Sequence, residues 1–221
     1  MIYLGVIGGY GPVDMSYEGL TLSFDASSAS VRSHTSVPIG SADADRTVFI
    51  IAHWAVSSVG AALLSATIGG VSATIHVQAN QATRGVAILS APLAVGTTTT
   101  VVLTLTGALA GYSSSVASFK ATSLISSTAY DTDSAIAVTV PTQAVTLDLK
   151  GDGILLAAAS LSSLAAAYGI SGATELYESM PAYVGGGDEI TADELARVVT
   201  FSRSGGSGTD FNGAVVAASF R

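Results

Sequence analysis

Short segments in which apolar and β-branched residues dominate or alternate with polar ones run along the whole chain, separated by glycine-rich stretches. Residues 20–24 (LTLSF) alternate strictly, and residues 46–56 (RTVFIIAHWAV) form a continuous β-branched and aromatic run. Such segments, about 10 to 20 residues apart, predict an all-β fold, a β-sandwich of jelly-roll type with about a dozen short strands. The further expected strands are 73–77, 84–91, 97–107, 114–124, 135–140, 144–150, 153–160, 173–179, 196–204 and 213–221. Glycine-rich stretches between the strands, such as VGGGDE at residues 184–189, are expected to form turns.

Two segments also carry helical signals, so the sequence predicts at most one or two short helices. In residues 155–169, Ala157, Leu161, Leu164 and Tyr168 keep a helical spacing, and this segment stays open between helix and strand. In residues 190–199 (ITADELARVV), a threonine followed three positions later by glutamate forms a capping-box pattern. This second segment predicts a helix of one or two turns.

The chain contains a weak internal echo at an offset of about 100 residues. The echo leaves two alternatives open: two pseudo-repeated halves that divide near residues 125–134, or two strand-rich halves of similar composition. Because no charged, proline-rich linker lies there, we expect one continuous sandwich over residues 20–221, preceded by an apolar, glycine-rich arm at residues 1–19. The similar pairs are 49–58 with 154–163, 97–107 with 196–205, and 114–123 with 213–221.

The stretch FIIAHWAV (residues 49–56) places His53 beside Trp54, the only tryptophan. Successive side chains of a strand point to opposite faces, so these two residues cannot line one pocket. Both faces of the segment are apolar, which predicts a central strand covered on both sides, with a neighbouring subunit as one candidate cover. We interpret His53 as structural and Trp54 as a core residue or interface anchor.

Charge excludes several classes of partner. Sixteen acidic residues against eight basic ones give a net charge of −8, and no basic stripe is present. The phosphate neutralisation that drives nucleic-acid binding is therefore missing, and anionic membranes should repel the chain. Charged residues make up only 11% of the sequence, less than half the usual quarter. Because charge depletion is typical of interface cores, we expect part of the surface to be covered by other protein chains.

No reaction centre is indicated. Three histidines, His34, His53 and His76, are far apart, and no cysteine, serine-nucleophile elbow or cofactor motif is present. We therefore expect no catalytic residue, no cofactor and no enzyme activity. The acids after GGG, namely Asp188, Glu189 and Asp193, are weak candidates for a metal site, although such acids more often cap a helix.

Tyrosines spaced every seven residues mark the N-terminal arm. An apolar arm of this kind should pack on its own domain or on a neighbouring chain. The expected interface residues are Tyr3, Tyr10, Tyr17 and Trp54.

The chain carries several distinctive turn-and-strand motifs: Asp45-Arg46 before a strand, Ile68-Gly69-Gly70-Val71 followed by Ala73-Thr74, and Gly96 before a run of threonine and valine. Together with the closing strand GAVVAASFR, they resemble motifs of β-rich structural proteins of tailed bacteriophages and gene-transfer particles. The resemblance covers residues 41–221 loosely and carries over no functional residue.

The resemblance implies a virion structural role: head decoration, spike, fibre or tail component. We expect a non-enzymatic homo-oligomer that contacts other virion proteins, is assembled in the host cytoplasm, and binds neither nucleic acid nor membrane. The alternative is a host-receptor or carbohydrate-binding module of a tail fibre or spike, in which an acidic loop holds Ca²⁺ against a host surface glycan.

Overall fold

A computed structural model describes residues 12–23, 30–56, 60–106, 114–161, 167–179, 183–204 and 211–221. These ranges contain strands and no helix, which confirms the all-β prediction, and none of them holds a helix able to cross a membrane. The strands are β1 (Asp14–Ser23), β2 (Val31–Pro38), β3 (Thr47–Ala55), β4 (Leu63–Ile68), β5 (Val71–Ser72), β6 (Thr74–Gln81), β7 (Arg84–Pro92), β8 (Thr98–Leu105), β9 (Ser114–Thr122), β10 (Asp131–Val140), β11 (Thr142–Leu149), β12 (Gly153–Leu161), β13 (Ala167–Ser171), β14 (Glu175–Ser179), β15 (Tyr183–Ile190), β16 (Glu194–Ser204) and β17 (Phe211–Phe220).

The strands form four antiparallel sheets, two in each half of the chain. In the first half, the order β1-β9-β3-β7-β6 makes the first inner sheet and β2-β8-β4-β5 the first outer sheet. In the second half, β10-β17-β12-β15-β14 makes the second inner sheet and β11-β16-β13 the second outer sheet. The architecture is thus sandwich-like, while the jelly-roll connectivity stays a prediction.

The two halves repeat the same strand order. The strands of the two inner sheets correspond in order: β1-β9-β3-β7-β6 in the first and β10-β17-β12-β15-β14 in the second. The outer sheets correspond in the same way, with β2-β8-β4 in the first and β11-β16-β13 in the second. The three segment pairs of the sequence echo fall on β3 with β12, β8 with β16, and β9 with β17. The chain therefore builds two sandwiches of equivalent topology, with the change from one to the other between β9 and β10.

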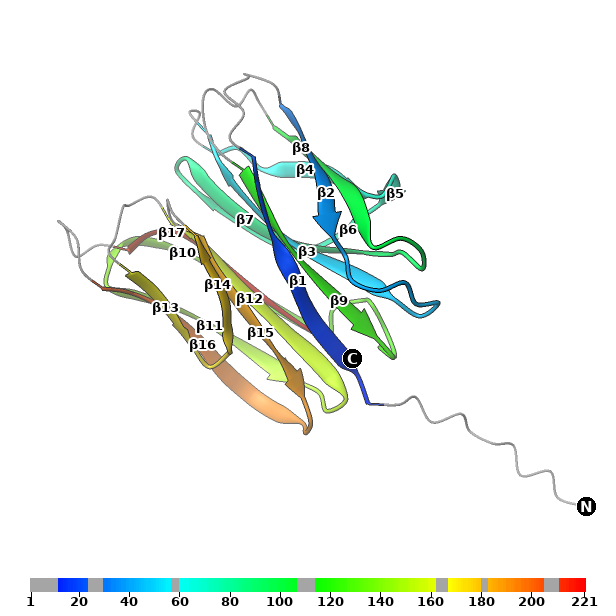
Figure 1. Cartoon of the computed structure of the whole chain (residues 1–221). Coiled ribbons are helices and arrows are strands. Elements are labelled where there is room, and N and C mark those ends of the chain that lie inside the picture. The colour runs from blue at the N-terminus through cyan, green and yellow to red at the C-terminus, as the bar shows by residue number, and fades with distance from the viewer. Residues whose placement is uncertain are drawn as a thin grey trace, which may run out of the picture.

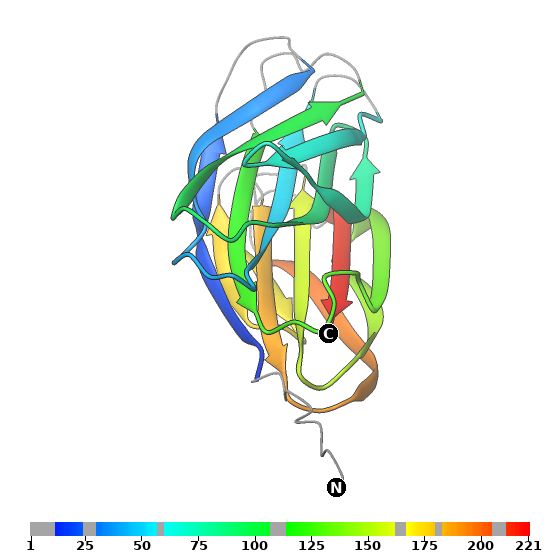
Figure 2. The same cartoon turned by 90° about the vertical axis from the view of Figure 1, so that its right-hand side faces the viewer.

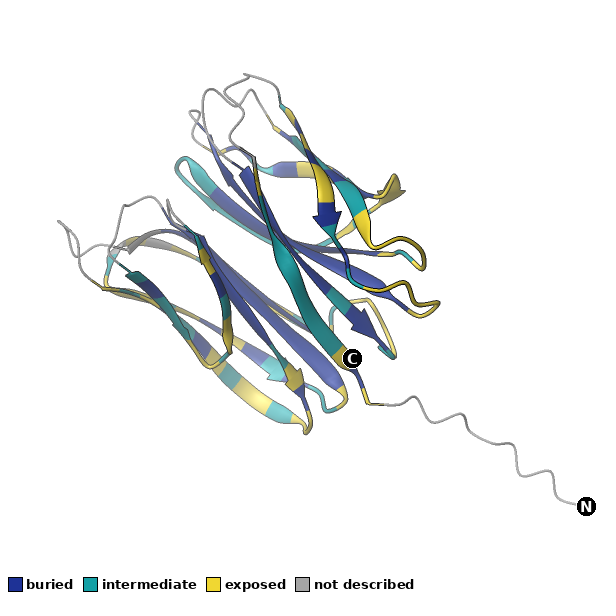
Figure 3. Cartoon of the chain, in the orientation of Figure 1, coloured by how far each residue is buried: buried dark blue, intermediate teal, exposed yellow. Residues whose placement is uncertain are grey.

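The four sheets stack as layers, with the two inner sheets face to face in the middle (Figure 1). Turned by 90°, the stack shows the strands of the inner sheets running roughly along one axis, with strands of the outer sheets crossing them obliquely (Figure 2). Three apolar layers separate the sheets: one inside each sandwich, and a middle core between the sandwiches. Burial is correspondingly concentrated in the inner sheets (Figure 3).

The central strands of the inner sheets are covered on both faces. All nine residues of β3 and all nine of β12 are buried. This confirms the expectation for residues 49–56, and the cover on each side comes from the same chain. A strand buried on both faces has no need for a polar alternation, which is why both segments read as continuous apolar runs.

The helical signals are overridden by sheet pairing. Residues 153–161 form β12 because hydrogen-bonded neighbours lie on both sides, β17 and β15. The helix expected in residues 190–199 is wrong, since β16 occupies residues 194–204 between β11 and β13. Its glutamate pairs with Arg197 instead of capping a helix, and Ala196 takes a positive φ of 54° where the pairing with β11 shifts register.

The expected arm is partly strand. β1 begins at Asp14 and pairs with β9, so residues 14–19 belong to the first inner sheet, and residues 1–11 lie outside the described part of the chain. The glycines of VGGGDE, expected in a turn, instead lie within β15.

A buried arginine fixes the loops at one end of the first sandwich. Arg46 is 1% exposed, and its guanidinium donates hydrogen bonds of 2.5–3.2 Å to backbone carbonyls only. Because both loops contribute acceptors, one side chain joins the segment before β3 to the segment after β7. The acceptors are the carbonyls of Ile39, Gly40, Ser41, Leu93, Val95 and Gly96.

Arg46→Met should lower the free energy of unfolding by at least about 3 kcal/mol, because it leaves several buried carbonyls without a donor. Urea denaturation followed by circular dichroism measures this. The control, Arg221→Met at the exposed C-terminus, should change stability by less than about 0.5 kcal/mol. A loss for Arg46→Met as small as the control's would contradict the role given to this arginine.

Candidate functional site

Polar and aromatic side chains from both sandwiches meet in the middle core in a group here called the interface cluster: Tyr17, His53, Tyr177 and Tyr183. Tyr17 and His53 come from β1 and β3 of the first sandwich, whereas Tyr177 and Tyr183 come from β14 and β15 of the second. The cluster therefore joins side chains of the two sandwiches that are more than 100 residues apart in the sequence.

His53 lies at the centre of the cluster. Its Nε2 and the Tyr177 hydroxyl share a hydrogen bond of 2.8 Å, and both side chains are buried. The imidazole stacks on Tyr183 at a centroid distance of 4.7 Å and an interplanar angle of 24°. Tyr177 in turn stacks on Tyr17 at 5.7 Å. Each ring is thus held by at least one neighbour from the opposite sandwich.

A glycine in β15 makes room for this arrangement. A Cβ placed on Gly185 would lie 2.3 Å from the Tyr177 hydroxyl oxygen, so any side chain there would collide with the phenol. Gly187, two residues on, lies under the methyl group of Met15 from β1. The glycines of β15 therefore give the second inner sheet a flat stretch over which side chains of β1 and β14 pack.

Burial keeps the cluster uncharged. Removal from water lowers the pKa of His53 to about 3 and raises the pKa of Tyr177 well above its ordinary value. Burial also raises the pKa of Tyr17. At neutral pH the pair is a neutral imidazole bonded to a neutral phenol. Enclosed in this way, the pair positions the sandwiches and offers no surface to a substrate.

The other two histidines serve similar packing roles. His34 shares a 3.0 Å hydrogen bond with Ser114, and burial, with Arg32 nearby, lowers its pKa to about 4. His76 bonds Ser90 at 2.8 Å and packs edge-on against Phe220 of the second sandwich, and burial lowers its pKa to about 4. The three histidines do not converge, as the sequence indicated.

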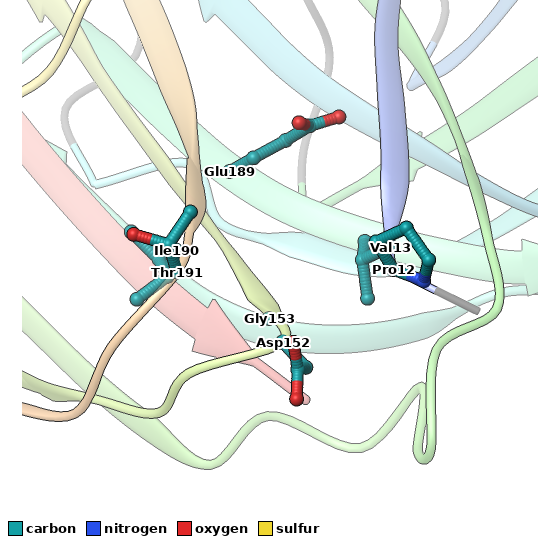
Figure 4. Close-up of a pocket in the computed structure, with 7 residues that line it drawn as sticks. All are labelled: Pro12, Val13, Asp152, Gly153, Glu189, Ile190 and Thr191. Atoms are coloured by element: carbon teal, nitrogen blue, oxygen red, sulfur yellow. The ribbon is translucent and has the colours of Figure 1, made fainter. Parts of the chain in front are cut away.

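A small hollow opens at the opposite end of the interface (Figure 4). Its volume is about 100 Å³, well below the roughly 300–1,000 Å³ of a pocket for a small molecule. Glu189, one of the residues that line the hollow, accepts a 2.6 Å hydrogen bond from the Met15 amide and so connects β15 to β1. The hollow is lined by Pro12, Val13, Asp152, Gly153, Glu189, Ile190 and Thr191.

The acids proposed as weak metal candidates are engaged separately. Asp188 accepts from the Thr174 amide and pairs with Arg197 at 3.3 Å. Asp193 accepts from Lys150 at 2.5 Å and from the Gly151 amide, and these bonds hold its pKa below the ordinary value. Within the described ranges, no three potential metal ligands lie together.

The expected interface residues have different positions. Trp54 has no exposed surface; its ring lies over Gly85 inside the first sandwich and its Nε1 donates to the Ala61 carbonyl. It is therefore a core residue, because no part of it can reach another chain. Tyr17 lies at the interface between the two sandwiches, and Tyr3 and Tyr10 lie outside the described residues.

Tyr177, Tyr183 and Gly185 were not singled out by the sequence. The only local signal was a strand expected at residues 173–179, and nothing in it indicated a partner in β3.

Comparison with family models, curated proteins and solved structures finds no match for this chain.

Gly185→Ala should destabilise the protein by about 1–3 kcal/mol, because the new methyl group displaces Tyr177 from His53. Thermal and urea unfolding measure the loss. Gly169→Ala is the matched control, since its Cβ would meet only the movable hydroxyl of Ser202 at 3.2 Å. If the new methyl group collides with Tyr177, Gly185→Ala should lower the free energy of unfolding less in a Tyr177→Leu background than in the wild type. Equal losses in both backgrounds would contradict this collision.

Acid should lower the free energy of unfolding because His53 is buried as a neutral imidazole. In the folded protein the pKa of His53 is about 3, below the ordinary 6.5, so the unfolded chain binds the proton first as the pH falls. The stability that neutral His53 contributes is therefore lost between about pH 6.5 and pH 3. The double variant His53→Phe with Tyr177→Phe removes this group without leaving an unpaired phenol. Between pH 6 and pH 4, its free energy of unfolding should fall less steeply than that of the wild type, by about 1.4 kcal/mol per pH unit. Identical slopes in urea titrations would contradict the assignment.

Proposed function

We propose that this protein is a structural, non-enzymatic subunit of a bacteriophage-like particle, which acts through protein–protein assembly. The observation that carries the proposal is the chemistry of the two outer sheet faces. They are the broad ends of the layered stack, and the outward residues at their centres are small or β-branched and uncharged.

The outward positions follow from the alternation of burial along the outer strands. In β8, Val101 and Leu103 are buried, so the residues between them face outward; in β16, Val199 and Phe201 are buried in the same way. A face whose central residues carry no charge loses little free energy when another protein chain covers it, as in the cores of interfaces. The outward residues toward the centres of the two faces include Ser33, Thr67, Thr100, Val102 and Thr104 on the first outer sheet, and Thr142, Ala144, Thr146, Val198, Thr200 and Ser202 on the second, whereas Asp148 lies near the end of β11.

The enclosed interface cluster fits a structural role as well. Its titratable pair is buried between the two sandwiches, and the hollow at the other end of the interface is too small for a substrate of ordinary size. The acids that a calcium-dependent glycan site would use are already bonded to backbone amides or to basic side chains. The assembly role therefore has more support than the glycan-binding alternative.

Quantitative mass spectrometry of particles purified from the source culture tests the proposal. We expect the protein to copurify with a major capsid or tail protein at a fixed ratio. Hundreds of copies per particle would place it in a lattice or tube, and a few to a few dozen would place it in a spike, fibre or baseplate. Its absence from particles would overturn the proposal.

Lysine at the centre of each outer face should block assembly without unfolding the chain. Val102→Lys and Thr200→Lys place a charge in the middle of the two outer sheets, where each residue has a strand partner on both sides. Burying an unpaired charge in an interface costs several kcal/mol. Incorporation into particles should fall at least about tenfold, measured by complementation and immunoblotting. Ser127→Lys, in the exposed connection between the sandwiches, is the control. Normal incorporation of both face variants would show that these faces stay in solvent.

A further inference from the structure

Several buried polar atoms without hydrogen-bond partners gather at one end of the middle core. Nδ1 of His53 and the hydroxyls of Ser115 and Ser160 have no partner in the described part of the chain, and all three residues are 0% exposed. Nε and Nη1 of Arg84 are also buried and find no hydrogen-bond partner among the described residues. These four residues come from β3, β9, β12 and β7, so both sandwiches contribute.

Strand register brings these side chains to one place. Ser115 lies directly opposite His53 in the β3–β9 pair, and the two share the face toward the second sandwich. Ser160 lies directly opposite Tyr183 in the β12–β15 pair, and Tyr183 stacks on the His53 ring at 4.7 Å. Directly opposed residues have Cβ atoms about 5 Å apart, so Ser115 lies beside the imidazole and Ser160 lies beside the Tyr183 ring that stacks on it.

Arg84 extends the group toward the end of the sheet. It lies opposite Ala55, two residues from the Val86 that opposes His53, and it shares their face. Gly85 between them faces the other way, under Trp54. A long side chain at such a diagonal position can reach its neighbour's surroundings.

Leaving these groups unpaired is too costly for a folded protein. Each buried polar group without a partner costs about 1–3 kcal/mol, against a total stability of about 5–15 kcal/mol. The missing partner has to supply acceptors to Arg84, and either a donor or an acceptor to Nδ1 of His53 and to each hydroxyl. Water meets these needs because it both donates and accepts hydrogen bonds, and it commonly makes about three such bonds in protein interiors.

We infer that the two sandwiches are joined by a buried hydration site, in which water molecules bridge His53 and Ser115 of the first sandwich to Ser160 of the second. Arg84 donates to the same water at the outer edge of the site. The middle core is thus hydrated where His53 meets Tyr183, whereas Phe49 and Phe220 pack directly on each other further along the same core.

A crystal structure of the full chain at about 1.5 Å or better tests the inference directly. The expected result is ordered water within about 3.2 Å of Nδ1 of His53 and of at least one of the two hydroxyls. Density showing direct bonds of these atoms to each other or to main-chain carbonyls, with no water, would overturn it. So would density for a larger bound molecule in the same place.

Oxygen-17 relaxation dispersion in solution, which counts long-lived internal water molecules, gives an independent measure. The double variant Ser115→Ala with Ser160→Ala should hold fewer long-lived internal water molecules than the wild type, by about one or more. Ser118→Ala is the matched control, because Ser118 is equally buried in β9 but donates to the Gly19 carbonyl. An unchanged count in the double variant, with circular dichroism confirming that it is folded, would also overturn the inference.

Discussion

The contact between the two inner sheets is the constraint on which the rest of the structure depends. It buries large side chains from both sandwiches, including Phe49, Ile51, Phe119, Leu156 and Phe220. Each such side chain contributes about 1.5–3 kcal/mol when it leaves water. Neither inner sheet could expose this face to solvent, so each sandwich requires the other. The outer sheets then complete the two outer cores.

The middle core is filled unevenly, and this positions the sandwiches relative to each other. On one side, β6 lies against β10 and β17, where small residues such as Ala79, Ala214 and Ala218 allow close approach. Toward β1, β14 and β15, the space holds the rings of the interface cluster, and the glycines of β15 make room for them. The bulk of the tyrosines on one side and the small residues on the other together set how the sheets meet.

Within this apolar contact, the hydrogen bond between His53 and Tyr177 fixes the registration of the two inner sheets. Apolar burial is proportional to area and tolerates sliding, whereas a buried hydrogen bond holds only at one registration of the two sheets. The pair therefore distinguishes the observed stacking from shifted ones. The same burial that makes the bond specific also keeps the imidazole neutral, so this feature serves architecture and leaves the exposed faces of the stack for contact with partners.

Local patterns in the sequence determined the strands. The β-branched runs and glycine-rich turns predicted the all-β class, and the apolar character of both faces of residues 49–56 predicted a strand covered on both sides. The sequence also placed His53 and Trp54 on opposite faces, since strand geometry alone decides this. The echo between β3 and β12 was visible too, because equivalent central strands face equivalent surroundings.

Tertiary structure decided everything that depends on distant partners. Residues 190–199 carried a helical capping signal, but pairing with β11 made residues 194–199 part of β16, because several ladder hydrogen bonds outweigh one local cap. The glycines of β15 read as a turn, since nothing nearby shows that Tyr177 will lie across them. The interface cluster joins residues separated by up to 166 positions, from Tyr17 to Tyr183. A local pattern shows which face a side chain takes, but only the packing of one sheet on another shows what that face meets.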